Sequence, residues 1–371
     1  MTETLVRVPH SPMLAWGYNN SGGLGLGHVA RVYRPAQAAL PAGVTAVQGG
    51  GEFTVARTSA GELYACGGNR YGQLGDGGTQ TRLTWEPVRL LAGTFVADVQ
   101  AGIDHVLALT AHGEVYAWGR NHRGQVGSGP TEHQLTPARV IESGAASLAA
   151  GRGTSAAVTT DGQLLTWGRN GSGQTGLGAT SDVTTPTASP LTGGVKAAAV
   201  DVGYQHTVVL TTTGELLAFG ADPRGRPLPL RVPLDQAWGR VRAIRAGSSF
   251  TLALTSRGLL LAWGANEAGQ LGLGDQVNRD APAVIAFPGT AGPVTSFWAG
   301  DHSAAAVTFG GEIYTWGETR FGEGGRGRVT APQTRPRRVT LPGGRRALAI
   351  SGGANHYIVT LGFGPGPGLP G

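Results

Sequence analysis

The sequence has almost none of the residues that disulfide bridges and cysteine-ligated metal sites require. Among its 371 residues, Cys66 is the only cysteine, so neither an internal disulfide nor a cysteine-based zinc site can form. No stretch approaches eighteen apolar residues, and residues 1–10 lack the apolar core of a signal peptide. The sequence therefore predicts no membrane span and a reducing, cytoplasmic setting.

Helical periodicity is also missing. No eleven-residue window has apolar residues at i, i+3, i+4 and i+7 between proper caps, which excludes a helical solenoid. The chain contains 64 glycines and 22 prolines, yet 40% of its residues are hydrophobic, which is too apolar for a disordered chain. Many short strands joined by tight turns account for this composition, so we predict an all-β fold.

Positive charge is concentrated in one window. Residues 318–346 contain eight arginines and two glutamates. The net charge of this window, +6, equals the formal net charge of the whole chain. We expect these arginines to lie mostly in solvent, where they would offer contacts to phosphate groups. The candidate basic patch consists of Arg320, Arg326, Arg328, Arg335, Arg337 and Arg338.

One unit repeats seven times along the chain. An aromatic residue followed by glycine recurs every 44 to 53 residues, and a second glycine, here called the marker glycine, stands sixteen residues before it. Between the two lie alternating apolar runs separated by a glycine turn, the pattern of a β-hairpin. An Asn-x-x-Gly turn and a proline-containing edge strand follow. The aromatic position is occupied by Trp16, Cys66, Trp118, Trp167, Phe219, Trp263 and Trp316, and the marker glycines are Gly50, Gly102, Gly151, Gly203, Gly247 and Gly300.

The two ends of the chain hold complementary halves of this unit. We therefore predict a seven-bladed β-propeller of four-stranded antiparallel blades, with the ring closed by the N- and C-terminal half-repeats. The strand at residues 14–16 should pair with the strand at 357–360. A single propeller is expected over residues 1–361, with a Gly/Pro-rich tail at 362–371. Its units are 49–100, 101–149, 150–201, 202–245, 246–298, 299–351, and 352–361 joined with 5–48.

The repeat Gly-x-x-His…Gly-Glu-(Leu/Val)-x-x-Trp-Gly-x-Asn-x-x-Gly-Gln-(Leu/Val)-Gly closely resembles the regulator of chromosome condensation repeat over about 350 residues. Members with this repeat include an exchange factor for a small GTPase, a plant UV-B photoreceptor and a bacterial β-lactamase inhibitor. The sequence departs from the first two. The blade spacings leave no room for the exchange factor's β-wedge, and no tryptophan follows a marker glycine as in the photoreceptor.

The resemblance implies a binding face formed by the two residues after each marker glycine. These residues differ from repeat to repeat, as expected of a binding surface carried on loops, although solvated loop tips are the alternative. Arg152 and Tyr204 come from adjacent repeats, should lie side by side, and are the best anchors for a protein partner. The candidate face consists of Glu52, Ile103, Asp104, Arg152, Tyr204, Gln205, Asp301, His302 and Asn355.

No constellation for catalysis is visible. Residues 322–327 match G-x-G-x-x-G, but no helix follows to meet a dinucleotide phosphate. His105, His206 and His356 occupy one slot in separate repeats, so we expect structural histidines tied to neighbouring backbone rather than a metal site. Cys66 fills an aromatic core slot and should be a buried thiol. The sequence predicts no catalytic residue, no metal and no cofactor.

The function predicted is that of a monomeric, cytoplasmic, bacterial scaffold that binds a protein partner on its loop face. Two alternatives remain open. One is an exchange or regulatory factor for a small GTPase, implied by the resemblance alone. The other is nucleic-acid binding through the arginines of residues 320–346.

Overall fold

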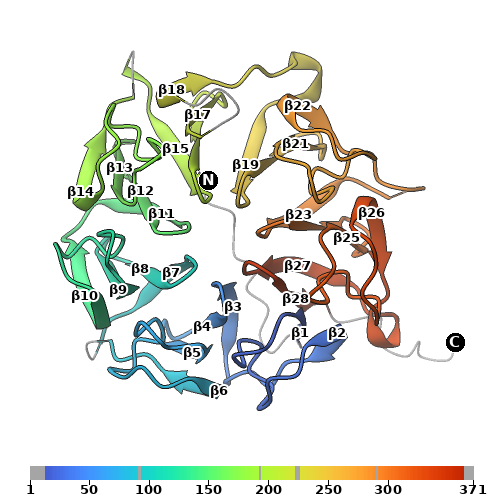
Figure 1. Ribbon diagram of the computed structural model, residues 1–371, viewed down its shortest axis with the longest axis horizontal. Coiled ribbons are helices and arrows are strands. Elements are labelled where there is room, and N and C mark those ends of the chain that lie inside the picture. The colour runs from blue at the N-terminus through green and yellow to red at the C-terminus, as the bar shows by residue number, and fades with distance from the viewer. Residues whose placement is uncertain (1–12, 91–92, 192–193, 222–225, 290, 363–371) are drawn as a thin grey trace, which may run out of the picture.

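The computed structural model describes residues 13–90, 93–191, 194–221, 226–289 and 291–362. Within these ranges the chain forms seven separate four-stranded antiparallel sheets, arranged as blades around a central axis (Figure 1). The predicted seven-bladed propeller is therefore confirmed. Two short 3-10 helices, η2 (Gln236–Trp238) and η3 (Pro342–Gly344), lie in connections between blades.

Six blades are built from four consecutive strands, with the first strand nearest the axis and the last at the rim (Figure 1). Blade 1 contains β3 (Val44–Gly49), β4 (Phe53–Thr58), β5 (Leu63–Gly67) and β6 (Arg82–Pro87), and blade 2 contains β7 (Val96–Ala101), β8 (His105–Thr110), β9 (Val115–Arg120) and β10 (His133–Ile141). Blade 3 contains β11 (Ala145–Ala150), β12 (Thr154–Thr159), β13 (Leu164–Gly168) and β14 (Val183–Ser189), and blade 4 contains β15 (Ala197–Val202), β16 (His206–Thr211), β17 (Leu216–Gly220) and β18 (Arg226–Arg231). Blade 5 contains β19 (Val241–Ala246), β20 (Phe250–Thr255), β21 (Leu260–Gly264) and β22 (Arg279–Val284), and blade 6 contains β23 (Val294–Ala299), β24 (Ser303–Thr308), β25 (Ile313–Gly317) and β26 (Gln333–Val339).

Blade 7 joins the two ends of the chain. Its strand order is β2-β1-β28-β27, so the inner strands come from the C-terminal half-repeat and the outer ones from the N-terminal half-repeat. β1 pairs antiparallel with β28, with Leu14 opposite Val359 and Trp16 opposite Tyr357. This confirms the predicted closure. The strands are β27 (Ala347–Gly352), β28 (His356–Leu361), β1 (Met13–Gly17) and β2 (Val32–Gln37), while the expected tail lies, from residue 363 on, outside the described residues.

The hydrophobic core lies between neighbouring blades. Phe53 and Val55 of blade 1, for example, share one buried cluster with Val99 and Trp118 of blade 2. The Trp118 indole N–H also donates to the Gln73 carbonyl oxygen of blade 1 at 3.0 Å. A buried indole stabilises a fold best when its N–H has a hydrogen-bond acceptor. The tryptophan of the repeat therefore joins its blade to the preceding blade in the ring. The same bond is made by Trp16, Trp167 and Trp316 to the carbonyls of Glu323, Gln125 and Gln270.

The three repeated histidines also join blades. His105 is fully buried, and its Nε2 lies 2.8 Å from the Ser155 hydroxyl of the next blade. Burial lowers the pKa of His105 to about 3. His206 and His356 contact Thr251 and Thr54 in the same way. The expectation of backbone partners was wrong, because the acceptor or donor is a side-chain hydroxyl that the neighbouring blade presents. Cys66 is buried as predicted, and burial raises the pKa of its thiol.

Candidate functional site

Seven short loops, each between the first and second strands of a blade, surround the axis on one face. The residue after the marker glycine donates its amide N–H to a carbonyl of the next blade, as Tyr204 does to Ser248 at 2.9 Å. The marker glycine makes this approach possible, since a Cβ on Gly203 would lie 2.3 Å from the Gly247 carbonyl oxygen. The other residues that donate in this manner are Gly51, Ile103, Arg152, Asp301 and Ala354.

The second residue of each loop is held through its carbonyl oxygen. The Asp104 carbonyl accepts the Arg120 amide N–H at 2.8 Å, directly after the Trp118-Gly119 pair. Gly119 has φ of +104°, and a Cβ there would lie 2.4 Å from that same oxygen. The repeated aromatic–glycine pair therefore fixes the loop on which the candidate residues stand.

The first loop residues converge and the second ones do not. Ile103, Arg152, Tyr204 and Asp301 line a single cavity at the mouth of the central channel. Five other candidates, here called the rim residues, lie outside this lining: Glu52, Asp104, Gln205, His302 and Asn355. Sequence reasoning treated both positions alike.

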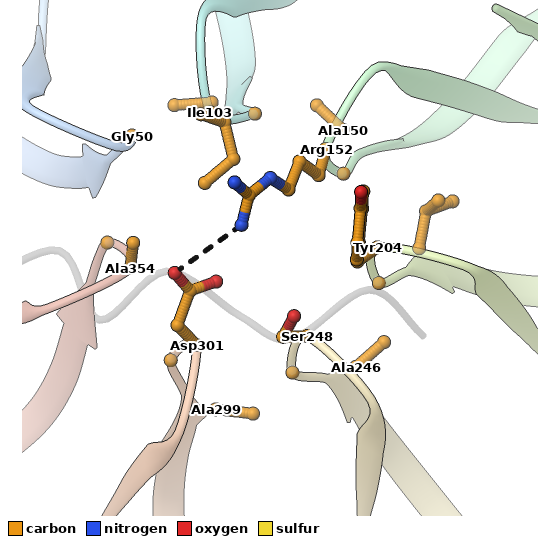
Figure 2. Close-up of a pocket in the computed structure, with 18 of the residues that line it drawn as sticks. Gly50, Ile103, Ala150, Arg152, Tyr204, Ala246, Ser248, Ala299, Asp301 and Ala354 are labelled. Carbon is orange, nitrogen blue, oxygen red and sulfur yellow. Dashed lines mark ion pairs between the residues drawn. The ribbon is translucent and has the colours of Figure 1, made fainter. Parts of the chain in front are cut away.

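Arg152 and Tyr204 lie side by side at the mouth, as their adjacent repeats predicted, and Figure 2 shows Arg152 extending toward Asp301. The Arg152 guanidinium carbon lies 4.7 Å from the centre of the Tyr204 ring, and that of Arg169 lies 4.5 Å from it. The Arg169 guanidinium lowers the pKa of the Tyr204 phenol below its usual value, and the Arg152 guanidinium lowers it further. Asp301 approaches Arg152 at 3.9 Å, a contact too long and exposed to contribute much stability.

Two of the rim residues, Glu52 and Asp104, are held by local polar contacts of their side chains. Asp104 forms an ion pair with Arg120 at 3.3 Å, and Glu52 accepts hydrogen bonds from the Tyr18 and Ser21 hydroxyls. Burial raises the pKa of the Asp104 carboxyl. These side chains are preorganised by their neighbours, which lowers the entropy lost on binding a partner.

Arginine–aromatic stacks on this side are the feature that sequence reasoning missed. Besides the Tyr204 stack, the Arg120 guanidinium lies 4.4 Å from the centre of the Tyr71 ring, and that of Arg320 lies 4.8 Å from the centre of Phe321. Arg120 and Arg169 each directly follow an aromatic–glycine pair. Aligning that third repeat position would have revealed them.

The mouth cavity is small, about 80 Å³. Ligand pockets for small organic molecules usually exceed about 300 Å³. Among the described residues, no three His, Cys, Asp or Glu side chains are grouped to hold a metal ion.

The candidate basic patch does not form one surface. Arg326, Arg328 and Arg337 line a common pocket, whereas Arg338 pairs with Glu312 at 3.2 Å. Arg320 stacks on the Phe321 ring, and Arg335 lies against Gly274. The expectation of solvent exposure holds for the other five but was wrong for Arg326, whose guanidinium is partly buried against Thr315.

In the part of the chain that the structure describes, no helix has the length and apolar character needed to cross a membrane.

Comparison with known proteins shows which family the chain resembles. Residues 10–228 match the model of the RCC1-like domain, and residues 257–307 and 310–359 match the regulator of chromosome condensation (RCC1) repeat. The chain is 31% identical over 350 residues to the ultraviolet-B receptor UVR8 of Arabidopsis thaliana, which covers 93% of this chain and 69% of the receptor. It is 30% identical over 227 residues to the secretion-regulating guanine nucleotide exchange factor of Bos taurus, covering 58% of this chain and 49% of that relative.

Solved structures show the same architecture. Human WBSCR16 superposes with a TM-score of 0.84 at 24% identity, covering 95% of this chain and all of the other. Prp20p from Saccharomyces cerevisiae gives 0.83 at 22% identity, covering 95% of this chain and 92% of the other. The repeat motif, the blade count and these matches agree, and the chain belongs to the RCC1 repeat family.

Proposed function

We propose that this propeller is a non-catalytic scaffold that binds a protein partner on its loop face. The observation that carries the proposal is the Tyr204 ring stacked against two guanidinium groups at the channel mouth. Tyrosine and arginine dominate the binding energy of protein interfaces when a polar rim excludes water around them. The rim of Glu52, Asp104 and their neighbours supplies such a surrounding. A monomeric state, a cytoplasmic location and a bacterial source remain predictions, and the relatives named above come from eukaryotes.

Replacing both Arg152 and Tyr204 with Ala is expected to weaken partner binding by about 2–4 kcal/mol while the protein stays folded. Neither residue belongs to the buried core. The immobilised parent chain would capture partners from lysate of the source cell, with nuclease added to remove nucleic-acid bridges. Proteins retained by the parent and lost by the double variant are the partners of the loop face.

The matched control replaces Ser248 and Ser249, in the equivalent loop of blade 5, with Ala. Their small side chains lie in the same face but offer little contact area, so this variant should retain the same proteins as the parent. If the Arg152 and Tyr204 variant also retained every protein at parental levels, the loop face would be the wrong surface.

Guanine-nucleotide exchange is the second candidate. It is favoured by the match to a secretion-regulating guanine nucleotide exchange factor, although the chain spans about half the length of that relative. If a captured partner is a small GTPase, release of a fluorescent GDP analogue from it, with and without the propeller, decides between exchange and simple binding.

A further inference from the structure

A pocket lined by four arginines lies at the rim between blades 6 and 7, and none of its lining residues belongs to the channel mouth. Its volume is about 340 Å³. Arg34 comes from β2, Arg337 from β26, and Arg326 and Arg328 from the loop that precedes β26. β2 and β26 are the outermost strands of their blades, and ring closure brings them together (Figure 1). The remaining lining residues are Gly327, Thr330 and Gln333.

Arg326 lies against a position where this repeat has glycine and other repeats have a larger, buried side chain. Where Gly324 stands, the equivalent positions of other repeats bury a side chain: Leu24, Leu74, Val126, Thr175 and Leu271. The space left at Gly324 is approached by the Arg326 guanidinium, whose Nη2 lies 3.4 Å from where a Cβ of residue 324 would be. Nη1 donates to the Thr315 hydroxyl at 2.9 Å and to the Arg337 carbonyl at 3.2 Å.

The Arg326 Nη2 atom is buried and has no hydrogen-bond partner among the described residues. Burial lowers the pKa of Arg326, and repulsion from the Arg337 guanidinium lowers it further. The same guanidinium group lines the pocket and is only partly solvated, so an anion held in the pocket would offset part of the cost of its burial.

No carboxylate of the described ranges forms an ion pair with any of the four pocket arginines. Arg320 and Arg338, from the same stretch of sequence, are paired with Glu318 and Glu312. The nearby Glu323 accepts the Phe321 amide N–H and makes no ion pair with Arg326. The pocket is therefore a concentration of positive charge that no carboxylate of the described residues neutralises.

Gly327 allows the two blades to share the pocket. Its amide N–H donates to the Tyr33 carbonyl of β2 at 2.7 Å, and its φ is +84°. A Cβ on residue 327 would lie 2.4 Å from Nε of Arg34. Only glycine lets Arg34 lie over the loop that carries Arg326 and Arg328.

We propose that this pocket binds a phosphate monoester group. Guanidinium groups match phosphate oxygens with paired, charge-assisted hydrogen bonds, and a phosphate monoester offers three free oxygens and close to two negative charges. Several arginines converging on one concave site suit a single group of this kind. A nucleic-acid backbone presents charges in a row and requires a stripe of cations, and the other arginines of the window lie elsewhere.

The phosphate monoester can belong to a phosphorylated side chain of a protein or to a small phosphorylated metabolite. The site is independent of the proposed protein-binding function, because none of its arginines lines the channel mouth or belongs to the candidate face. Its failure would leave the loop-face proposal untouched, and the reverse also holds.

The test titrates the full chain with inorganic phosphate, a phosphoserine peptide, glucose 6-phosphate and a single-stranded DNA oligonucleotide, and follows binding by calorimetry and by the rise in melting temperature. The three phosphate probes should bind the parent and bind more weakly as salt rises. Replacing Arg34 and Arg337 with Gln should weaken binding of these probes at least about tenfold. Both side chains are exposed, so the variant should melt like the parent without ligand.

The matched control replaces Arg320 and Arg338 with Gln, which removes the same amount of positive charge from outside the pocket. This variant should bind the phosphate probes within about twofold of the parent, since both residues lie outside the pocket. Tighter binding of the peptide or of the sugar phosphate identifies the source of the group, and either result supports the site. Equal losses in the two variants, no phosphate binding by the parent, or tighter binding of the DNA than of the monoesters would overturn it.

Discussion

A chain that lacks residues 1–20 is expected to melt roughly 10 °C or more below the full chain, if it folds at all. The deletion removes β1, which pairs with β28 on one side and with β2 on the other. It also removes the buried side chains of Leu14 and Trp16 and the indole hydrogen bond that ties blade 7 to blade 6. Calorimetry of the purified chains measures the difference.

The control ends the chain after Gly362, which retains every described strand and should leave the melting temperature unchanged. Adding a synthetic peptide of residues 1–20, which carries β1, should restore part of the stability lost from the N-terminal deletion. Equal melting temperatures for the two truncated chains would refute closure of the ring through β1.

Replacing Glu323 with Gln is expected to stabilise the protein by about 3 kcal/mol above neutral pH. Glu323 occupies the repeat position where other repeats carry Gln73, Gln125, Gln174 and Gln270. Its carboxylate accepts the Phe321 amide N–H, just as the Gln73 side-chain oxygen accepts the equivalent amide N–H of Tyr71. Its second oxygen, Oε1, is buried and has no partner within the described ranges. Burial raises the pKa of this carboxyl to about 7.

The direction of the pH dependence follows from that shift. The pKa of Glu323 in the folded protein lies above its usual 4.5, so the folded state holds a proton that the unfolded state releases. The cost of ionising this carboxyl is absent below about pH 4.5, grows as the pH rises, and is complete above about pH 7. Glutamine carries no charge, so the stabilisation of the variant over the parent should grow across this range.

Buried histidines act in the opposite sense. Burial lowers the pKa of His206 and His356 to about 4, so both stay neutral in the folded state and the protein loses stability as the pH falls below about 6.5. The parent and the Glu323 variant share this loss of stability. It therefore cancels when their melting temperatures are subtracted at the same pH. An exposed control, Glu132→Gln, should change stability by less than about 0.5 kcal/mol at every pH. A difference between variant and parent that stays constant with pH would contradict the assignment.

The fold was readable from the sequence because each blade repeats the same backbone requirements. A glycine is needed wherever neighbouring loops approach within contact of a Cβ, as at Gly203, and an aromatic is needed where an indole reaches the preceding blade, as at Trp118. These requirements recur at a fixed spacing and are therefore visible. The pairing of β1 with β28 followed from counting half-repeats.

The sites were less readable because they depend on departures from the repeat. Arg34 and Arg326 are more than 290 residues apart in sequence, and only ring closure places them in one pocket. The buried charge of Glu323 is a single substitution in the glutamine slot, which a search for common features passes over. At the channel mouth, the adjacency of Arg152 and Tyr204 was predictable because their repeats are neighbours, whereas the second guanidinium on Tyr204 comes from a strand end that received no attention.

Closure through blade 7 also has a consequence for synthesis on the ribosome. β1 is made early, but its partner β28 follows more than 340 residues later. At ordinary elongation rates the nascent strand waits roughly 15–70 s, with the apolar side chains of Leu14 and Trp16 lacking the surface that finally covers them. Throughout that interval the growing chain offers an open sheet edge at its beginning and another at each newly finished blade. Translation speed and chaperone capture of β1 are therefore expected to influence how much of this protein reaches the closed ring.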